Sequence, residues 1–180
     1  MPHSFDSEPH TAVVSPPAPL TCRQLDHLPS DPARAAVGHY QCLVVSVQTA
    51  RREMLLRAAA EGGWQTLYAA DAATARRQLA RMFVQLAIVD LDHAPEEDAG
   101  EFRRVLEDLS EMTGLLLVVC GNEETPLEEI WARQLGVWLY LPGVTEADEV
   151  ALLCGEARQI TEQIQAAQGA RPMHDLPGNL

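Results

Sequence analysis

The sequence predicts an α/β domain built on a doubly wound, five-stranded parallel sheet. Short apolar runs alternate five times with segments of helical periodicity, and connections of only a few residues join them. The run Leu86–Asp92 (LAIVDLD) is typical of a strand that is buried on both faces of a parallel sheet. Because crossovers between parallel strands are right-handed, this repeat predicts helices on both faces and the strand order 2-1-3-4-5.

The signals for the individual elements follow the same alternation along the chain. The predicted strands are 42–47, 64–68, 86–92, 115–120 and 137–141. The predicted helices are 50–62, 72–83, a segment after the acidic loop HAPEEDAG, 124–135 and one that begins at Thr145. Gly62 and Gly63 end the first helix, and Asp71 caps the second.

Apolar spacing indicates which faces of the later helices point inward. The third helix carries Phe102, Val105, Leu106 and Leu109 toward the core. In the last helix the apolar residues recur at intervals of three and four, and the stripe continues through Ile160 and Ile164.

The two ends of the chain differ in composition from the predicted domain at residues 40–167. Residues 1–39 hold seven of the twelve prolines and show little apolar periodicity, which predicts a disordered arm. Residues 168–180 contain glycine and proline and are predicted to form a flexible tail.

Charge and cysteine content exclude several classes of function. The formal net charge is -13, which disfavours direct contact with nucleic acid or an anionic membrane surface. The four cysteines are scattered without metal-ligand spacing, so we expect neither a disulfide framework nor a metal site. The N-terminus lacks signal-peptide features, and no apolar run is long enough to cross a membrane, so a cytoplasmic protein is expected.

At the carboxyl ends of the predicted strands the chain resembles the response-regulator receiver domain, over residues 41–165. The matching segments are VVSVQ, IVD, VVCG and GVWLYLP. The resemblance implies a flavodoxin-like fold in which an acidic pair and an aspartate hold magnesium and the aspartate accepts a phosphoryl group. It also implies assistance from a serine or threonine at the end of the fourth strand and from a lysine at the end of the fifth.

Carried over by position, the resemblance implies a degenerate pocket around Asp90, the phosphoacceptor position, and Asp92. The acidic pair is replaced by Ser46 and Val47, the hydroxyl by Cys120 and the lysine by Leu141, whereas the following Pro142 is retained and Trp138 takes the switch-aromatic position. Magnesium requires several hard oxygen ligands, and phosphoryl transfer depends on charge neutralisation. The chain contains no lysine that could supply the missing charge.

These departures predict a pseudo-receiver, a phosphorylation-independent interaction module in bacterial two-component signalling, with no cofactor and no enzymatic activity. The resemblance implies a contact surface on the fourth helix, fifth strand and fifth helix, which would form a homodimer or bind a larger signalling protein. The residues predicted for contact are Trp131, Trp138, Tyr140, Ile160 and Ile164. Strand alternation predicts that Trp138 and Tyr140 point to the same side, and Tyr140 is expected in the core.

Several alternatives remain open from the sequence. Asp90 could still accept a phosphoryl group, or the fold could bind a small ligand, although no glycine-rich phosphate motif is present. The loop carboxylates and imidazole could hold a metal through Asp92, His93, Glu96 and Asp98. Cys120 could be a redox thiol, and Arg51 with Arg52 could attract an anion to the first helix.

Overall fold

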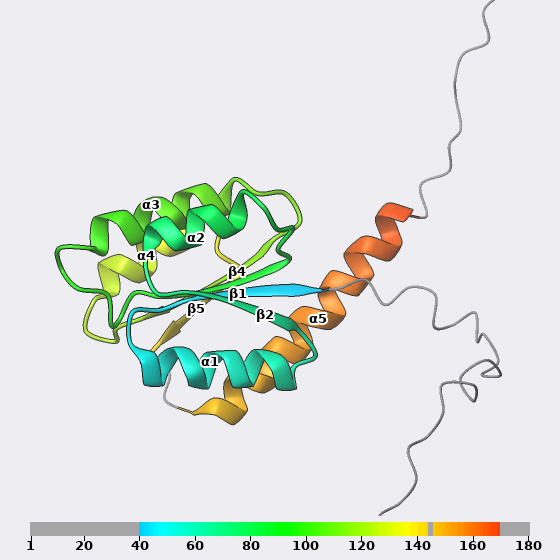
Figure 1. Ribbon diagram of the computed structural model, residues 1–180, viewed down its shortest axis with the longest axis horizontal. Helices are drawn as coiled ribbons and strands as arrows, with labels where there is room; N and C mark the ends of the chain where they lie inside the picture. Colours follow the sequence, from blue (N-terminus) through cyan, green and yellow to red (C-terminus); the bar gives the residue numbers. More distant parts are fainter. Residues whose placement is uncertain (1–39, 144–145, 170–180) are drawn as a thin grey trace, which may run out of the picture. The chain divides into compact units, whose positions relative to one another are not determined.

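The computed structural model describes residues 40–143 and 146–169, which form one α/β unit (Figure 1). The predicted N-terminal arm, Thr145 and the last eleven residues lie outside the described residues. The strands are β1 (Gln41–Val45), β2 (Gln65–Ala69), β3 (Leu86–Asp90), β4 (Leu116–Gly121) and β5 (Leu139–Pro142). The helices are α1 (Thr49–Glu61), α2 (Ala72–Leu79), α3 (Ala99–Ser110), α4 (Pro126–Gln134) and α5 (Ala147–Gly169).

The predicted sheet topology is confirmed. All neighbouring strands are parallel, and their order is β2-β1-β3-β4-β5. Every residue of β3 is buried, as expected for the central strand of a covered sheet. The two edges of the sheet are β2 and β5.

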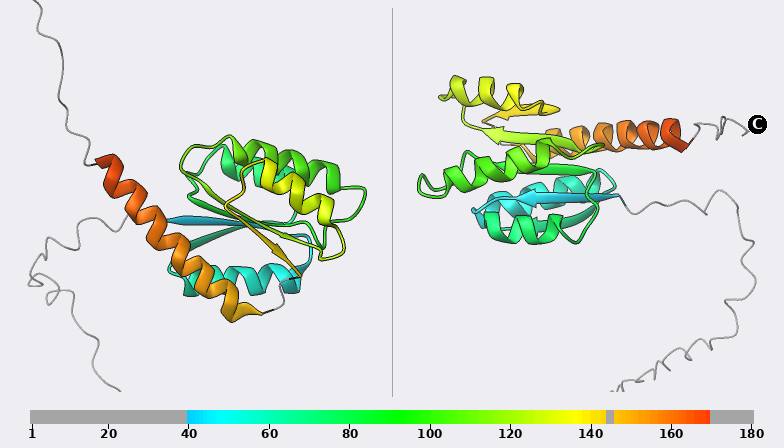
Figure 2. Two further views of the ribbon diagram at one scale, coloured as in Figure 1. Left: turned by 180° about the vertical axis from the view of Figure 1, so that it is seen from behind. Right: turned by 90° about the horizontal axis from the view of Figure 1, so that it is seen from above.

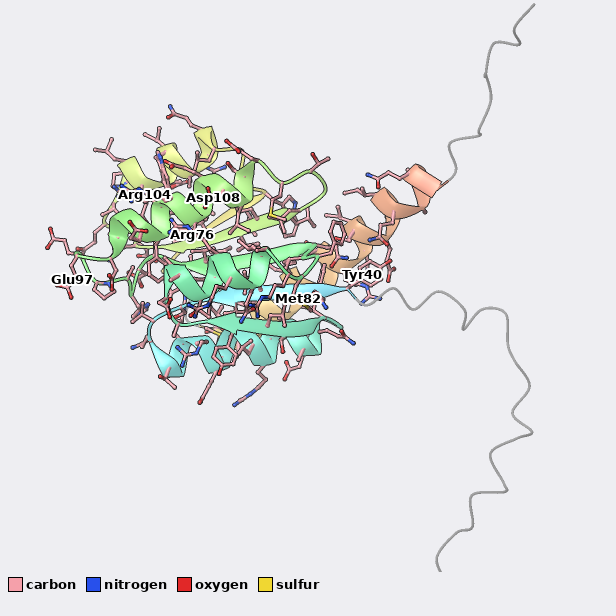
Figure 3. All side chains as sticks on the ribbon, turned by 45° about the horizontal axis from the view of Figure 1, so that its top comes forward. Tyr40, Arg76, Met82, Glu97, Arg104 and Asp108 are labelled. Atoms are coloured by element: carbon pink, nitrogen blue, oxygen red, sulfur yellow. The ribbon has the colours of Figure 1, made fainter. Side chains whose placement is uncertain are left out.

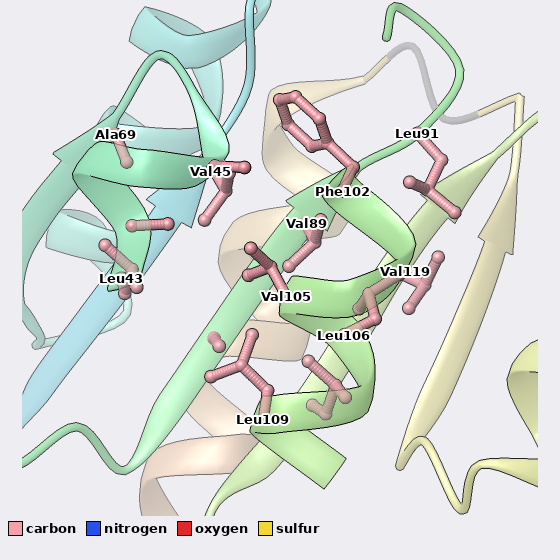
Figure 4. Close-up of a cluster of buried hydrophobic side chains, with 14 of the residues drawn as sticks. Leu43, Val45, Ala69, Val89, Leu91, Phe102, Val105, Leu106, Leu109 and Val119 are labelled. Carbon is pink, nitrogen blue, oxygen red and sulfur yellow. The ribbon is translucent and has the colours of Figure 1, made fainter. Parts of the chain in front are cut away.

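The helices form two layers on opposite faces of the sheet, with α2, α3 and α4 on one face and α1 and α5 on the other (Figures 1 and 2). Successive strand residues contribute to different layers because side chains alternate across a sheet. In β3, Ala87 and Val89 pack toward α3, whereas Leu86 and Ile88 pack toward α1 and α5. Figure 4 shows the first of these clusters, which contains all four residues predicted to face inward from α3.

Several element boundaries differ from the prediction. The second helix ends at Leu79, and Phe83, which was assigned to that helix, is 67% exposed in the following segment. The last strand begins at Leu139, because the chain bends at Trp138. The last helix extends to Gly169, two residues beyond the predicted end of the domain.

Charged side chains connect α2 to α3 on the surface shown in Figure 3. Nη1 of Arg76 lies 2.9 Å from Glu101, and its Nε lies 3.3 Å from Asp108. These pairs are partly solvated, so they add little to stability. Within the described residues, no helix combines the length and apolar character needed to span a membrane.

Candidate functional site

Asp90 ends the central strand at the carboxyl edge of the sheet, where loops of an open α/β sheet usually form a binding site. Its carboxylate is completely buried. Because it alternates in phase with Leu86 and Ile88, it lies on the α1 and α5 side of the sheet. The predicted acceptor is therefore closed off from solvent.

Ser46 is a hydrogen-bond partner of this carboxylate. Its buried hydroxyl donates to Oδ2 of Asp90 over 2.8 Å. Val47, the second position of the expected acidic pair, is half-buried and packs against the cluster on the other face of the sheet. Where the resemblance implies two carboxylates, the chain thus provides one hydroxyl donor and one apolar side chain.

The loop after β3 places a second carboxylate and an imidazole next to Asp90. Nδ1 of His93 lies 3.3 Å from Oδ1 of Asp90 and 3.6 Å from Oδ2 of Asp92. Among the described residues, no three His, Cys, Asp or Glu side chains form a group that could hold a metal. The alternative loop site with Glu96 and Asp98 is therefore not formed, and both of those residues are exposed.

Cys120 lies beside Asp90, in register on the neighbouring strand β4. Burial raises the pKa of its thiol to about 12, although the nearby Arg51 guanidinium opposes this shift; the charge of Asp90 adds to it. A thiol with this pKa is protonated at neutral pH and is a weak nucleophile. The redox alternative for Cys120 therefore finds no support in the site.

The two arginines at the start of α1 have different environments. Arg51 is buried and lies close enough to Cys120 to affect its pKa. Arg52 points elsewhere: its Nη1 donates to the carbonyl oxygen of Ser46 over 2.9 Å, and its guanidinium lies over the ring of Tyr68. Nothing in the sequence pattern distinguishes these two neighbouring arginines.

An apolar side chain, Leu141, occupies the position at the end of β5 where the resemblance implies a lysine. Leu141 pairs with Cys120 in register and packs with the apolar residues between the sheet and α5. Pro142 follows it, pairs with Gly121 and is exposed. This strand end therefore contributes packing to the site and no positive charge.

The three aromatic residues predicted for contact have different environments. Tyr140 is buried, and its hydroxyl donates to Oε1 of Glu128 over 3.1 Å. Trp131 is half-buried, with the Arg103 guanidinium 5.5 Å from its ring centre. Tyr140 belongs to the core, as expected, and is not available to a partner.

The prediction that Trp138 and Tyr140 share one side of the sheet is wrong. Tyr140 lies in the cluster beneath α2, α3 and α4, whereas half-buried Trp138 packs against the cluster beneath α1 and α5. The bend at Trp138 places this residue outside the strand, so the alternation rule does not apply to it.

The apolar residues of α4 and α5 differ in their exposure to solvent. Leu127 is 79% exposed and Ile130 is 53% exposed, both on α4. In α5, Ile160 packs against the core, and both Ile160 and Ile164 are half-buried. The sequence pattern does not reveal the exposure of Leu127 and Ile130, because an interval of three residues also fits an inward-facing stripe.

The fold is similar to that of known receiver domains. No family model matches the sequence, and no curated protein matches it. Among solved structures, a CheY-like receiver domain from Methanospirillum hungatei JF-1 has 16% identity and a TM-score of 0.59, and the match covers 69% of this chain and 98% of that chain. The receiver domain of a putative LuxO repressor protein from Vibrio parahaemolyticus has 14% identity and a TM-score of 0.61, with 72% and 98% covered.

A longer protein gives a similar match. NtrX from Brucella abortus has 18% identity and a TM-score of 0.62, and the match covers 78% of this chain and 31% of that protein. At these identities the likeness concerns the arrangement of strands and helices. The chain has the fold of a response-regulator receiver domain.

Proposed function

We propose that this chain is a pseudo-receiver that acts in bacterial signal transduction as a phosphorylation-independent protein interaction module. The observation that carries this proposal is the burial and hydrogen bonding of the Asp90 carboxylate. Its carboxylate is completely buried and accepts a hydrogen bond from Ser46. A phosphodonor must reach a carboxylate oxygen in line with its leaving group, and burial opposes that approach.

The chemistry around Asp90 supports the same conclusion. Ser46 and Val47 cannot replace the two carboxylates that would complete a magnesium site. Leu141 supplies no charge where the receiver family has a lysine, and the chain contains no lysine at all. Arg51 brings a guanidinium close to Cys120, but one guanidinium does not replace both a metal ion and an ammonium group, so we expect no catalysis and no cofactor.

Intact mass spectrometry tests the proposal directly. The full chain and its Asp90→Ala variant are incubated with acetyl phosphate and magnesium, next to an active receiver domain as positive control. We expect an adduct only on the positive control. A phosphoryl adduct on the wild-type chain that is lost in Asp90→Ala would show that the domain is an atypical phosphoacceptor.

For contact we propose the surface formed by α4, β5 and the adjoining part of α5, which we name the α4 surface. Its exposed apolar residues are Leu127 and Ile130, and β5 pairs only with β4 in the described sheet. Exposed apolar side chains grouped on one element are typical of a protein contact. The proposed partner is a second copy of the chain or a larger signalling protein.

Sedimentation velocity separates these partners. The full chain is compared with Leu127→Asp/Ile130→Asp, and Phe83→Asp serves as control because Phe83 is an exposed apolar residue outside the α4 surface. We expect self-association, or retention of a larger partner, that only the α4 variant loses. A strict monomer that retains no partner from a lysate would contradict the proposed interaction role.

The cysteines support a reducing compartment, and we propose the cytoplasm. Cys42, Cys120 and Cys154 are all buried and unpaired with one another. Free buried thiols are common in proteins that fold under reducing conditions.

A further inference from the structure

A groove lies between the end of α1 and the first half of α5, which run side by side on one face of the sheet (Figures 1 and 2). Its volume is about 740 Å³. The lining residues are Glu61, Gly62, Gly63, Asp148, Ala151, Leu152, Gly155, Glu156 and Gln159. We name it the α1–α5 groove; the described residues of the chain leave it open to solvent.

Two glycines of the groove have different relations to the rest of the chain. A Cβ atom on Gly62 would lie 2.5 Å from Cβ of Cys154, so close packing of α1 against α5 requires this glycine. A Cβ atom on Gly155 would meet no heavy atom within 4 Å. Glycine inside a helix lowers stability, and no neighbouring atom of the described residues fills the space that a Cβ atom on Gly155 would occupy. The open space over Gly155 can therefore receive a side chain from outside.

Next to this space lies Leu152, a large apolar residue with acidic residues around it. Leu152 is 74% exposed, and Asp148 and Glu156 lie one helical turn before and after it. Glu61 adds a third carboxylate from the end of α1. None of the residues that line the groove is basic.

Arg158 follows the acidic rim on α5 but pairs with other groups. Arg158 donates to the carbonyl oxygen of Gly63 over 2.6 Å and to Glu162 over 2.8 Å, and its guanidinium lies 3.7 Å from the ring centre of Tyr40. Its guanidinium is therefore engaged at the Gly63 end of the groove and with groups outside the lining. The groove thus has an apolar floor, formed by Ala151, Leu152 and Gly155, and a negatively charged rim.

We propose that the α1–α5 groove binds a basic amphipathic helix of a partner protein. An apolar side chain of that helix sits over Gly155 and Ala151 against Leu152, and its lysine or arginine residues face the three carboxylates. This goes beyond the proposed function, because it assigns a second surface, on another helix pair, and states the chemistry of its partner.

Charge selects this occupant over the alternatives. A second copy of the chain would bring the same three carboxylates against themselves, and each copy carries a formal net charge of -13. Nucleic acid would be repelled for the same reason. A divalent cation is not favoured, since the described residues contain no group of three metal-ligating side chains.

Two synthetic helical peptides provide the probe. They share length and a leucine and alanine face, and their polar faces carry lysine in one peptide and glutamate in the other. Each is titrated into the ¹⁵N-labelled full chain. We expect the lysine peptide alone to shift the amides of Gly62, Leu152 and Gly155, with an affinity that falls about tenfold from low to high salt.

Three variants decide whether the groove itself binds. Gly155→Leu fills it without changing charge, and it should fold at least as well because leucine favours a helix. Glu61→Arg/Glu156→Arg reverses the rim, and Glu97→Arg/Glu107→Arg makes the same charge change at exposed positions elsewhere. We expect about tenfold weaker binding for the first two variants and little change for the third.

The proposal is overturned by equal binding of the glutamate peptide, by full binding to Gly155→Leu, or by an equal loss of binding in the Glu97 and Glu107 control. A wild-type dimer that Gly155→Leu dissociates would also overturn it, by making the occupant a second copy. If Leu127→Asp/Ile130→Asp abolishes peptide binding, the peptide occupies the α4 surface; the groove is then rejected while the proposed function stands.

Discussion

The carboxyl edge around Asp90 and the helix surfaces of α4 and α5 expose their side chains in opposite ways. At the edge, a carboxylate and a hydroxyl are completely buried and bonded to each other. On the helices, Leu127 and Leu152 are largely exposed. A binding edge normally presents polar groups to solvent, whereas a helix surface normally buries its leucines. In this chain the polar groups of the edge are buried and leucines of the helices are exposed. We therefore expect partner proteins to contact the helix surfaces and not the edge.

The largest expected difference between the two regions is in stability. Phe102 is buried on α3 and lies near Leu91, just beyond Asp90 (Figure 4). Phe102→Ala should lower the free energy of unfolding by about 4 kcal/mol, because a large cavity forms. Leu152→Ala should change it by less than about 0.5 kcal/mol. Urea denaturation measures both, and similar losses would remove the contrast between the buried residues beneath α3 and the exposed helix surface.

The two neighbouring aspartates should differ by a smaller amount. Asp90→Ala removes the 2.8 Å acceptor of the buried Ser46 hydroxyl and should cost about 2 kcal/mol. Asp92→Ala changes a partly exposed side chain and should cost less than about 0.5 kcal/mol. Asp90→Asn, which keeps an acceptor oxygen, should fall between them. If Asp90→Ala is as stable as wild type, the edge is not closed by this bond.

Alkaline pH should sharpen the comparison through Cys120, whose pKa in the folded chain is about 12 against an ordinary value of 9.0. The folded state keeps this proton while the unfolded state loses it above pH 9, so stability is complete below pH 9 and falls as pH rises toward 12. At pH 10 the loss from this thiol is on the order of 1 kcal/mol. Cys120→Ala should lose correspondingly less between pH 8 and pH 10 in urea denaturation. An identical pH dependence in the variant would contradict the burial of the thiol.

The smallest effect is expected at the hydrogen bond that ties β5 to α4. Tyr140→Phe removes the 3.1 Å bond to Glu128 and should lower the free energy of unfolding by about 1 kcal/mol. Tyr68→Phe is the matched control, because Tyr68 is exposed on β2 and should tolerate the change. Thermal unfolding followed by circular dichroism compares the two, and equal midpoints would show that Tyr140 does not anchor α4.

Much of the fold was predictable because its signals are local. Buried strands such as β3 are short apolar runs, and Asp71 caps α2 as expected, since its Oδ1 accepts the Thr74 amide proton over 2.7 Å. The end of α2 was missed because Met82 continues the apolar spacing beyond Leu79. Met82 still packs against the core, but from the segment after the helix.

The candidate site was predictable only in part, because its details depend on residues far apart in the chain. The end of a central strand located Asp90, but the burial of Arg51 depends on the space between α1 and the sheet. On α4, spacing alone did not distinguish Ala132, which is buried, from Leu127 and Ile130, which are exposed. The rotation of such a short helix about its axis is decided by tertiary packing.

The bond from Ser46 to Asp90 has a consequence for how this protein would carry information. A carboxylate that takes its hydrogen-bond partner from the same polypeptide has that partner as soon as the chain has folded. In the proposed role no chemical mark distinguishes an idle molecule from an engaged one. The amount of protein made, and how long it persists, then become the quantities that a cell can regulate.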